Sequence, residues 1–293
     1  MSIVLKNTPE GNGEYASIWR ISGKMSLSPD IDNLAQEAPL EIRYGKKLQD
    51  RLVTMRTPGA DKLLAIGLLH DMGMLDGADK LLRISQPHPN NIHVHLRQIS
   101  PGNPVEGSRQ TPITSACGIC GDSHLDLDSL LTSRSLDPGT PKIPIQCILE
   151  LPEQLHEAQA LFASSGGLHA AALFDLHGQL LRLEEDVGRH NAVDKVIGWA
   201  YLENRLPLTQ HVLMVSGRTS YEIVKKCIRA RIPVLASVSA PSSLAVELAT
   251  ACMMTLIGFL RPPRFNVYAG PERLTGQNCA SLYTSENPGA ESD

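Results

Sequence analysis

The chain has 293 residues, of which 42% are hydrophobic, and this is enough for one large domain or two smaller ones, each with its own core. Its net charge of -4 lacks the basic surplus of a general nucleic-acid binder. No apolar run approaches the ~20 residues that cross a bilayer, and the first residues lack the pattern of a signal peptide. These features predict a cytoplasmic protein that binds neither nucleic acid nor membrane.

The first part of the chain predicts a small α+β domain over residues 37–113. Alternating apolar residues predict strands at 39–44, 52–56 and 92–97, with a helix over about 60–75 between the second and the third. Residues 99–113, rich in Pro, Gly, Ser and Gln, predict a loop. Residues 1–36 and 275–293 are polar without sustained periodicity and predict flexible tails.

The second part is more regular and predicts an α/β domain over residues 127–274. A hairpin comes first, at 168–174 and 179–183. Thr219 and Glu222 predict a capping box that opens one of the helices that follow. Strands then alternate with helices, which predicts a sheet flanked by helices. The expected helices are at 191–204, from about 219, and at 242–253, and the expected strands are at 211–215, 233–238 and 255–259.

Of the six cysteines, Cys117 and Cys120 form the one close pair, in a glycine-flanked segment at 114–126. An exposed thiolate on such a loop suits the transfer of sulfur. A zinc half-site and a redox dithiol are the alternatives. Zinc needs four ligands, and even with His124 only three are at hand. A thioredoxin-type dithiol needs a strand-to-helix junction, whereas a long polar segment precedes this pair. Two unreactive loop cysteines are the simplest alternative.

Several turns carry residues that suit an anion. Arg189 and His190 stand at a predicted helix start, where free N–H groups attract negative charge. Ordinary helix caps would look the same. Further along, Arg261 and Arg264 flank two prolines in a turn that could grip a phosphate, although a basic surface turn explains it equally well. The other turns, each after a predicted strand, contribute Ser216, Gly217, Arg218 and Ser242.

Taken together and in order, these segments resemble the FdhD family of formate dehydrogenase accessory sulfurtransferases. The resemblance runs from about residue 37 to residue 274. The matching stretches include Thr54-Met-Arg-Thr-Pro-Gly59, Cys117-Gly-Ile-Cys-Gly121, Glu185-Asp-Val-Gly-Arg-His-Asn-Ala-Val-Asp-Lys195, Val215-Ser-Gly-Arg218 and Ala240-Pro-Ser-Ser-Leu-Ala245.

The resemblance implies a function and a fold. Members of the family accept sulfur as a persulfide from a cysteine desulfurase and pass it to Mo-bis(molybdopterin guanine dinucleotide), which is then inserted into formate dehydrogenase. Their second half resembles the cytidine deaminase fold, which implies a layered α/β/α domain beside the smaller α+β domain. This chain lacks the zinc signature of that enzyme, so deamination is not expected.

The resemblance also assigns residues. The persulfide position falls on Cys117, with Cys120 as a second participant, and no metal site is expected. The resemblance also makes a homodimer a plausible oligomeric state for this chain. The cofactor-binding segment comprises Phe259, Leu260, Arg261, Pro262, Pro263 and Arg264.

Two other functions stay open at this stage. One is a non-catalytic chaperone that binds the molybdenum cofactor and docks on formate dehydrogenase. The other is a zinc-dependent nucleoside-type enzyme, which the fold alone would suggest.

Overall fold

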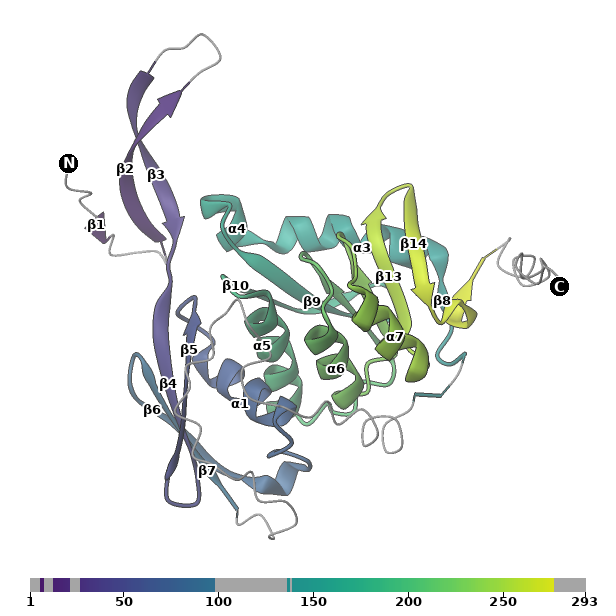
Figure 1. The fold of residues 1–293 in the computed structure, drawn as a ribbon, viewed down its shortest axis with the longest axis horizontal. Coiled ribbons are helices and arrows are strands. Elements are labelled where there is room, and N and C mark those ends of the chain that lie inside the picture. The colour runs from purple at the N-terminus through teal and green to yellow at the C-terminus, as the bar shows by residue number, and fades with distance from the viewer. Residues whose placement is uncertain (1–5, 8–12, 22–26, 98–135, 138, 277–293) are drawn as a thin grey trace, which may run out of the picture.

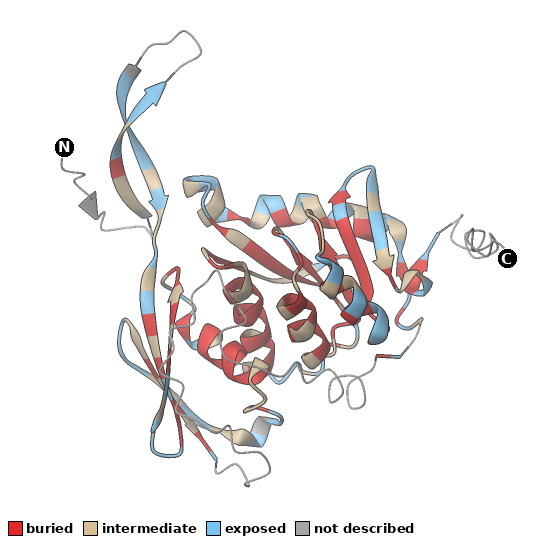
Figure 2. Ribbon diagram, viewed as in Figure 1, coloured by how far each residue is buried: buried red, intermediate tan, exposed pale blue. Residues whose placement is uncertain are grey.

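The computed structural model describes residues 6–7, 13–21, 27–97, 136–137 and 139–276 (Figure 1). Two sheets with their helices form the body of the protein. The buried residues gather where these helices pack against the sheets (Figure 2). The mixed α/β fold that we predicted is confirmed.

The smaller sheet has four strands in the order β5-β4-β7-β6. Strand β4 pairs antiparallel with β5 and parallel with β7, while β6 closes the other edge. One helix, α1 (Asp61–Asp71), packs on it through Leu64 and Leu68 against Ile42 and Ile92. The strands are β4 Ala38–Gly45, β5 Asp50–Arg56, β6 Leu81–His88 and β7 Asn91–Leu96.

The larger sheet has six strands in the order β10-β9-β11-β12-β13-β14. The three central strands β11, β12 and β13 are parallel, and the outer pairings are antiparallel. The strands are β9 His169–Asp175, β10 Leu180–Asp186, β11 His211–Val215, β12 Val234–Ser237, β13 Thr255–Arg261 and β14 Arg264–Ala269.

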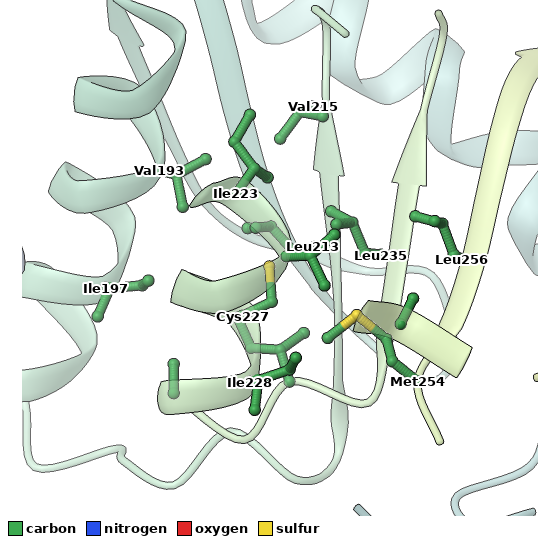
Figure 3. Close-up of a cluster of buried hydrophobic side chains, with 14 of the residues drawn as sticks. Val193, Ile197, Leu213, Val215, Ile223, Cys227, Ile228, Leu235, Met254 and Leu256 are labelled. Atoms are coloured by element: carbon green, nitrogen blue, oxygen red, sulfur yellow. The ribbon is translucent and has the colours of Figure 1, made fainter. Parts of the chain in front are cut away.

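Helices cover both faces of this sheet and make three layers. Along β11, Leu213 and Val215 point to the face covered by α5, α6 and α7, whereas Val212 and Met214 point to the face covered by α3. Figure 3 shows Val193 and Ile197 of α5 and Ile223 and Cys227 of α6 directed at Leu213 and Leu235. The helices are α3 Ile145–Ala158, α4 Ala160–Ser165, α5 Arg189–Leu202, α6 Tyr221–Arg229 and α7 Ser243–Ala251.

Helices α1 and α5 join the two sheets by crossing backbone against backbone. A Cβ atom on Gly67 would lie 1.9 Å from the carbonyl oxygen of Asp194, and one on Gly198 would lie 1.9 Å from that of Leu63. Only glycine allows so close an approach. Tyr201 of α5 also belongs to the core of the smaller sheet. The two parts of the chain therefore share a packed interface.

Two paired strands stand where we expected a flexible tail, so that prediction is wrong for residues 13–21 and 27–35. Strands β2 (Gly13–Ile21) and β3 (Leu27–Ala35) pair antiparallel and project from the body (Figure 1). A short β1 (Lys6–Asn7) adds to β2, and the Asn33 side-chain amide donates to the Ser164 carbonyl at 3.2 Å. Most side chains of these two strands are exposed and many are polar. The alternation of apolar and polar residues that marks a strand is therefore weak in this part of the sequence.

Other differences from the prediction are local. The sequence did not predict β6, α3 or β14. The capping box at Thr219 is wrong, because α6 begins after Ser220 and has no side-chain cap. Small elements complete the described chain: η1 Ala78–Lys80, β8 Ile143–Pro144, η2 Pro271–Arg273 and β15 Leu274–Thr275.

Candidate functional site

The predicted anion-binding turns meet at one edge of the larger sheet. Strands β11, β12 and β13 are parallel, so the turns after them lie side by side at their carboxyl ends. Strand β9 runs the other way and begins at this edge, and β10 ends there, since Asp186 pairs with His169. We call this the carboxyl edge. Ligands in open α/β sheets commonly bind at such an edge.

Helix α5 begins at the carboxyl edge and places Arg189 and His190 there. His190 Nε2 lies 3.0 Å from the Ser220 hydroxyl and 3.9 Å from a Glu222 carboxylate oxygen. Burial, together with the nearby charges of Lys226 and Arg189, lowers the pKa of His190 to about 4. His190 is therefore neutral at pH 7 and able to accept or donate one hydrogen bond through each ring nitrogen, according to its tautomer.

Gly217 leaves room for two side chains, those of His169 and Arg189, to lie against its turn. A Cβ atom at this position would lie 3.1 Å from His169 Nδ1 and 3.6 Å from Arg189 Cδ. Burial lowers the pKa of His169, and the charges of Arg189 and Arg218 add to this. Next to Gly217, Ser216 accepts a hydrogen bond from the Ala170 amide at 2.8 Å, which ties the turn to β9. The cluster is basic, as an anion site requires.

Ser242 serves first as a helix cap. Its hydroxyl accepts from the Ala245 amide at 3.3 Å, and its own amide donates to the Thr219 carbonyl at 3.0 Å. These bonds join the turns after β11 and β12. Ser242 is also exposed, so a ligand at the carboxyl edge can reach it.

The predicted cofactor segment forms the end of the β13–β14 hairpin. Phe259 has a left-handed backbone (φ 50°) and is 42% exposed, and its amide donates to the Ser239 carbonyl at 3.1 Å. Arg261 and Arg264 pair across the hairpin, and both are exposed. Leu260 is buried and anchors the strand, while Pro262 and Pro263 form the exposed turn. The arrangement presents one aromatic ring and two guanidinium groups outward.

A fully buried ionic network holds the start of α5 in place. Lys195 Nζ lies 2.7 Å from an Asp186 carboxylate oxygen and donates to the Thr57 carbonyl at 3.2 Å. Asp186 also accepts from the Gly188 amide at 2.8 Å and from Asn191 at 3.0 Å. Because Thr57 follows β5, the network connects the smaller sheet to the carboxyl edge. The sequence shows Asp186 and Lys195 only as members of one motif, because no local pattern reveals that a charged side chain is buried.

A second buried ionic cluster lies between α1, α5 and α6. Lys226 Nζ is 2.7 Å from Asp194 and 3.1 Å from Asp71. Asp71 is thus part of a structural ion pair, and the attraction of the buried carboxylates raises the pKa of Lys226. Among the described residues, no group of His, Cys, Asp and Glu side chains could hold a metal ion.

The proposed persulfide residues Cys117 and Cys120 lie outside the described residues, as does the whole predicted segment 114–126. Three other cysteines are described. Cys227 and Cys252 are buried and pack as small apolar side chains, and burial raises the pKa of the Cys147, Cys227 and Cys252 thiols. Cys147 is partly buried and offers a natural control for thiol chemistry.

These features define a mixed α/β protein in which basic side chains gather at the carboxyl edge of a sheet that has helices on both faces. Among the described helices, none is long and apolar enough to span a bilayer. The sequence profile of the FdhD/NarQ family matches residues 35–275. The chain therefore belongs to the FdhD/NarQ family.

Individual relatives agree with this assignment. The sulfur carrier protein FdhD of Streptomyces avermitilis is 44% identical over 89% of this chain and 95% of its own length. The sulfur carrier protein FdhD of Mycobacterium tuberculosis is 44% identical over 89% of this chain and 99% of its own length. That of Saccharolobus solfataricus is 42% identical over 84% of this chain and 92% of its own length. A crystal structure of a candidate formate dehydrogenase accessory protein from Desulfotalea psychrophila is similar in fold, with a TM-score of 0.71, 24% identity, and coverage of 90% of this chain and 99% of that one.

Proposed function

We propose that the protein is a sulfur carrier that accepts a persulfide sulfur on Cys117 and delivers it to the molybdenum cofactor of a formate dehydrogenase. The observation that carries the proposal is the similarity, over more than four fifths of this chain, to relatives named sulfur carrier protein FdhD. The Cys117-Gly-Ile-Cys120 motif supplies the thiols that such a carrier needs.

The loading step conserves atoms and electrons. The persulfide of a cysteine desulfurase carries a terminal sulfur that the Cys117 thiolate attacks, so a new S–S bond forms on Cys117. The S–S bond of the donor breaks, and its cysteine leaves as a thiolate. On delivery the S–S bond on Cys117 breaks and its Sγ leaves as a thiolate, while the terminal sulfur would become sulfide on the molybdenum centre, the two electrons coming from the reduced metal of the substrate. In this scheme Cys120 is a neighbouring thiol that assists either step.

The carboxyl edge supplies features that suit the delivery substrate. A bis-guanine dinucleotide carries phosphates and aromatic bases. Arg189, Arg218, Arg261 and Arg264 offer paired donors for phosphate, and Phe259 offers an exposed ring for stacking. His190, Ser216, Gly217 and Ser242 complete the turns. We assign Mo-bis(molybdopterin guanine dinucleotide) to this edge as the substrate.

Formate dehydrogenase maturation in a strain that lacks the endogenous carrier tests the proposal. The Cys117→Ala variant should give no active dehydrogenase, whereas Cys147→Ala should support maturation like the wild type. Both variants should accumulate to the same level, because each substitution removes a single sulfur atom from a small side chain. Full maturation by Cys117→Ala would overturn the sulfur-carrier function and favour a chaperone that binds the cofactor without carrying sulfur.

A further inference from the structure

A cavity lies at the opposite end of α5 from the carboxyl edge. It has a volume of about 630 Å³, within the range of small-molecule sites. The ends of α1, α5 and α6 surround it, so it sits between the two parts of the protein. Its apolar wall includes Leu75, Leu206 and Pro207, with the Tyr201 ring, and its polar lining includes Arg229 and Arg231.

The polar groups in the lining differ in whether they already have partners within the protein. Arg229 donates to the His70 carbonyl at 3.2 Å and lies 3.5 Å from the Asp76 carboxylate, so its charge is already balanced. The Tyr201 hydroxyl donates to the Gly77 carbonyl at 2.8 Å. Within the described part of the chain, the Arg231 guanidinium has no hydrogen-bond or ion-pair partner. Among the residues that the structure describes, none balances this positive charge, which stands beside an apolar wall.

The helix ends around the cavity are closed by backbone bonds. After α6, the Ile232 amide donates to the Cys227 carbonyl at 2.9 Å and the Arg231 amide to the Ile228 carbonyl at 3.0 Å. This motif places Arg231 in a left-handed conformation, with φ at 58°, where glycine is usual. The carbonyls of Cys227 and Ile228 are therefore satisfied without the Arg231 side chain, which is left to serve another partner.

Met253 provides an internal comparison. It ends α7 with the same backbone bonds and a φ of 56°, yet it lines no part of the cavity. The left-handed backbone by itself is therefore an ordinary feature of this chain. What distinguishes Arg231 is the position of its charge in the lining.

We propose that this cavity binds a small organic anion, with one carboxylate or phosphate group held by Arg231 and an apolar body against Leu75, Leu206 and Tyr201. A guanidinium group binds either anion through paired donors. The proposal is independent of the sulfur-carrier function, because none of these residues lies at the carboxyl edge.

Phenyl phosphate is a suitable probe, and its binding to the full chain can be followed by NMR titration. We expect shifts at the backbone amides of Tyr201, Asn204 and Ala230. Inorganic phosphate, which lacks the ring, and phenol, which lacks the charge, should each bind more weakly. Equal binding of inorganic phosphate or of phenol would overturn the assigned ligand class.

Two matched variants locate the site. Arg231→Gly removes the charge and places glycine where the backbone favours it, so we expect at least tenfold weaker binding with no lower melting temperature. Met253→Gly makes the same backbone change away from the cavity and should bind the probe like the wild type. If Arg231→Gly proves unstable, Arg231→Gln should show the same loss of binding. Unchanged binding in the Arg231 variants, or loss of binding in Arg218→Gln instead, would overturn the proposal.

Discussion

Replacing Gly198 by alanine tests how the two parts of the protein are joined. The new Cβ atom would lie 1.9 Å from the Leu63 carbonyl oxygen, about 1.5 Å short of ordinary contact at 3.4 Å. Both atoms belong to rigid helices, so α1 and α5 must move apart along their whole interface. Overpacking costs about 1–3 kcal/mol and occasionally more, and so short an approach between two backbones belongs at the upper end of that range. Helix propensity alone would instead stabilise the protein by about 1 kcal/mol, so the two effects predict opposite signs.

The assay is chemical denaturation of the full chain, followed by circular dichroism. Gly67→Ala should be destabilised to a similar extent, because its Cβ would lie 1.9 Å from the Asp194 carbonyl oxygen. The double variant should lose less than the sum of the two, since the helices need to separate only once. Lys62→Ala on the exposed side of α1 should change stability by less than about 0.5 kcal/mol. A Gly198→Ala protein as stable as the wild type would refute the close crossing.

Three further predictions follow from the site. Lys195→Met leaves the Asp186 carboxylate buried without its partner at 2.7 Å, and should lower the free energy of unfolding by about 3–5 kcal/mol in urea titrations. His190 has a pKa of about 4 when folded and about 6.5 when unfolded, so the stability it contributes is present above pH 6.5 and is lost as the pH falls to 4. The loss should be about 3 kcal/mol, and His190→Asn should remove it from a pH series of unfolding curves. Arg261→Ala and Arg264→Ala should each weaken cofactor binding by about 1–3 kcal/mol while sulfur loading on Cys117 stays normal, and calorimetry with mass spectrometry on the same variants would show whether the two steps separate in this way.

Strong local patterns predicted the larger sheet well. Strand β11 at His211–Val215 matches the prediction residue for residue, because a short apolar run between turn residues specifies a buried strand. Arg218 and Ser242 lie near each other because each follows one of two neighbouring parallel strands, β11 and β12. Boundaries shifted by a few residues where caps differ, as at Ser220.

Features that depend on distant contacts could not be predicted. The crossing at Gly67 and Gly198 involves two helices more than a hundred residues apart, and each glycine alone looks like a weak point in a helix. The buried Lys195–Asp186 pair reads as a solvated charge cluster until the fold brings Thr57 against it. The β2–β3 hairpin was missed because its exposed strands carry Asp and Ser beside Trp19 and Ile31, without a consistent apolar face.

The central claim is that Cys117 carries sulfur, and mass spectrometry of the protein after incubation with a cysteine desulfurase and cysteine tests it most directly. We predict an adduct of about 32 Da, one sulfur atom, on the peptide that contains Cys117, removable by a reductant. The adduct should be absent from Cys117→Ala and present in Cys147→Ala. A wild-type protein that acquires no sulfur on Cys117 under conditions in which the desulfurase is active would contradict the account.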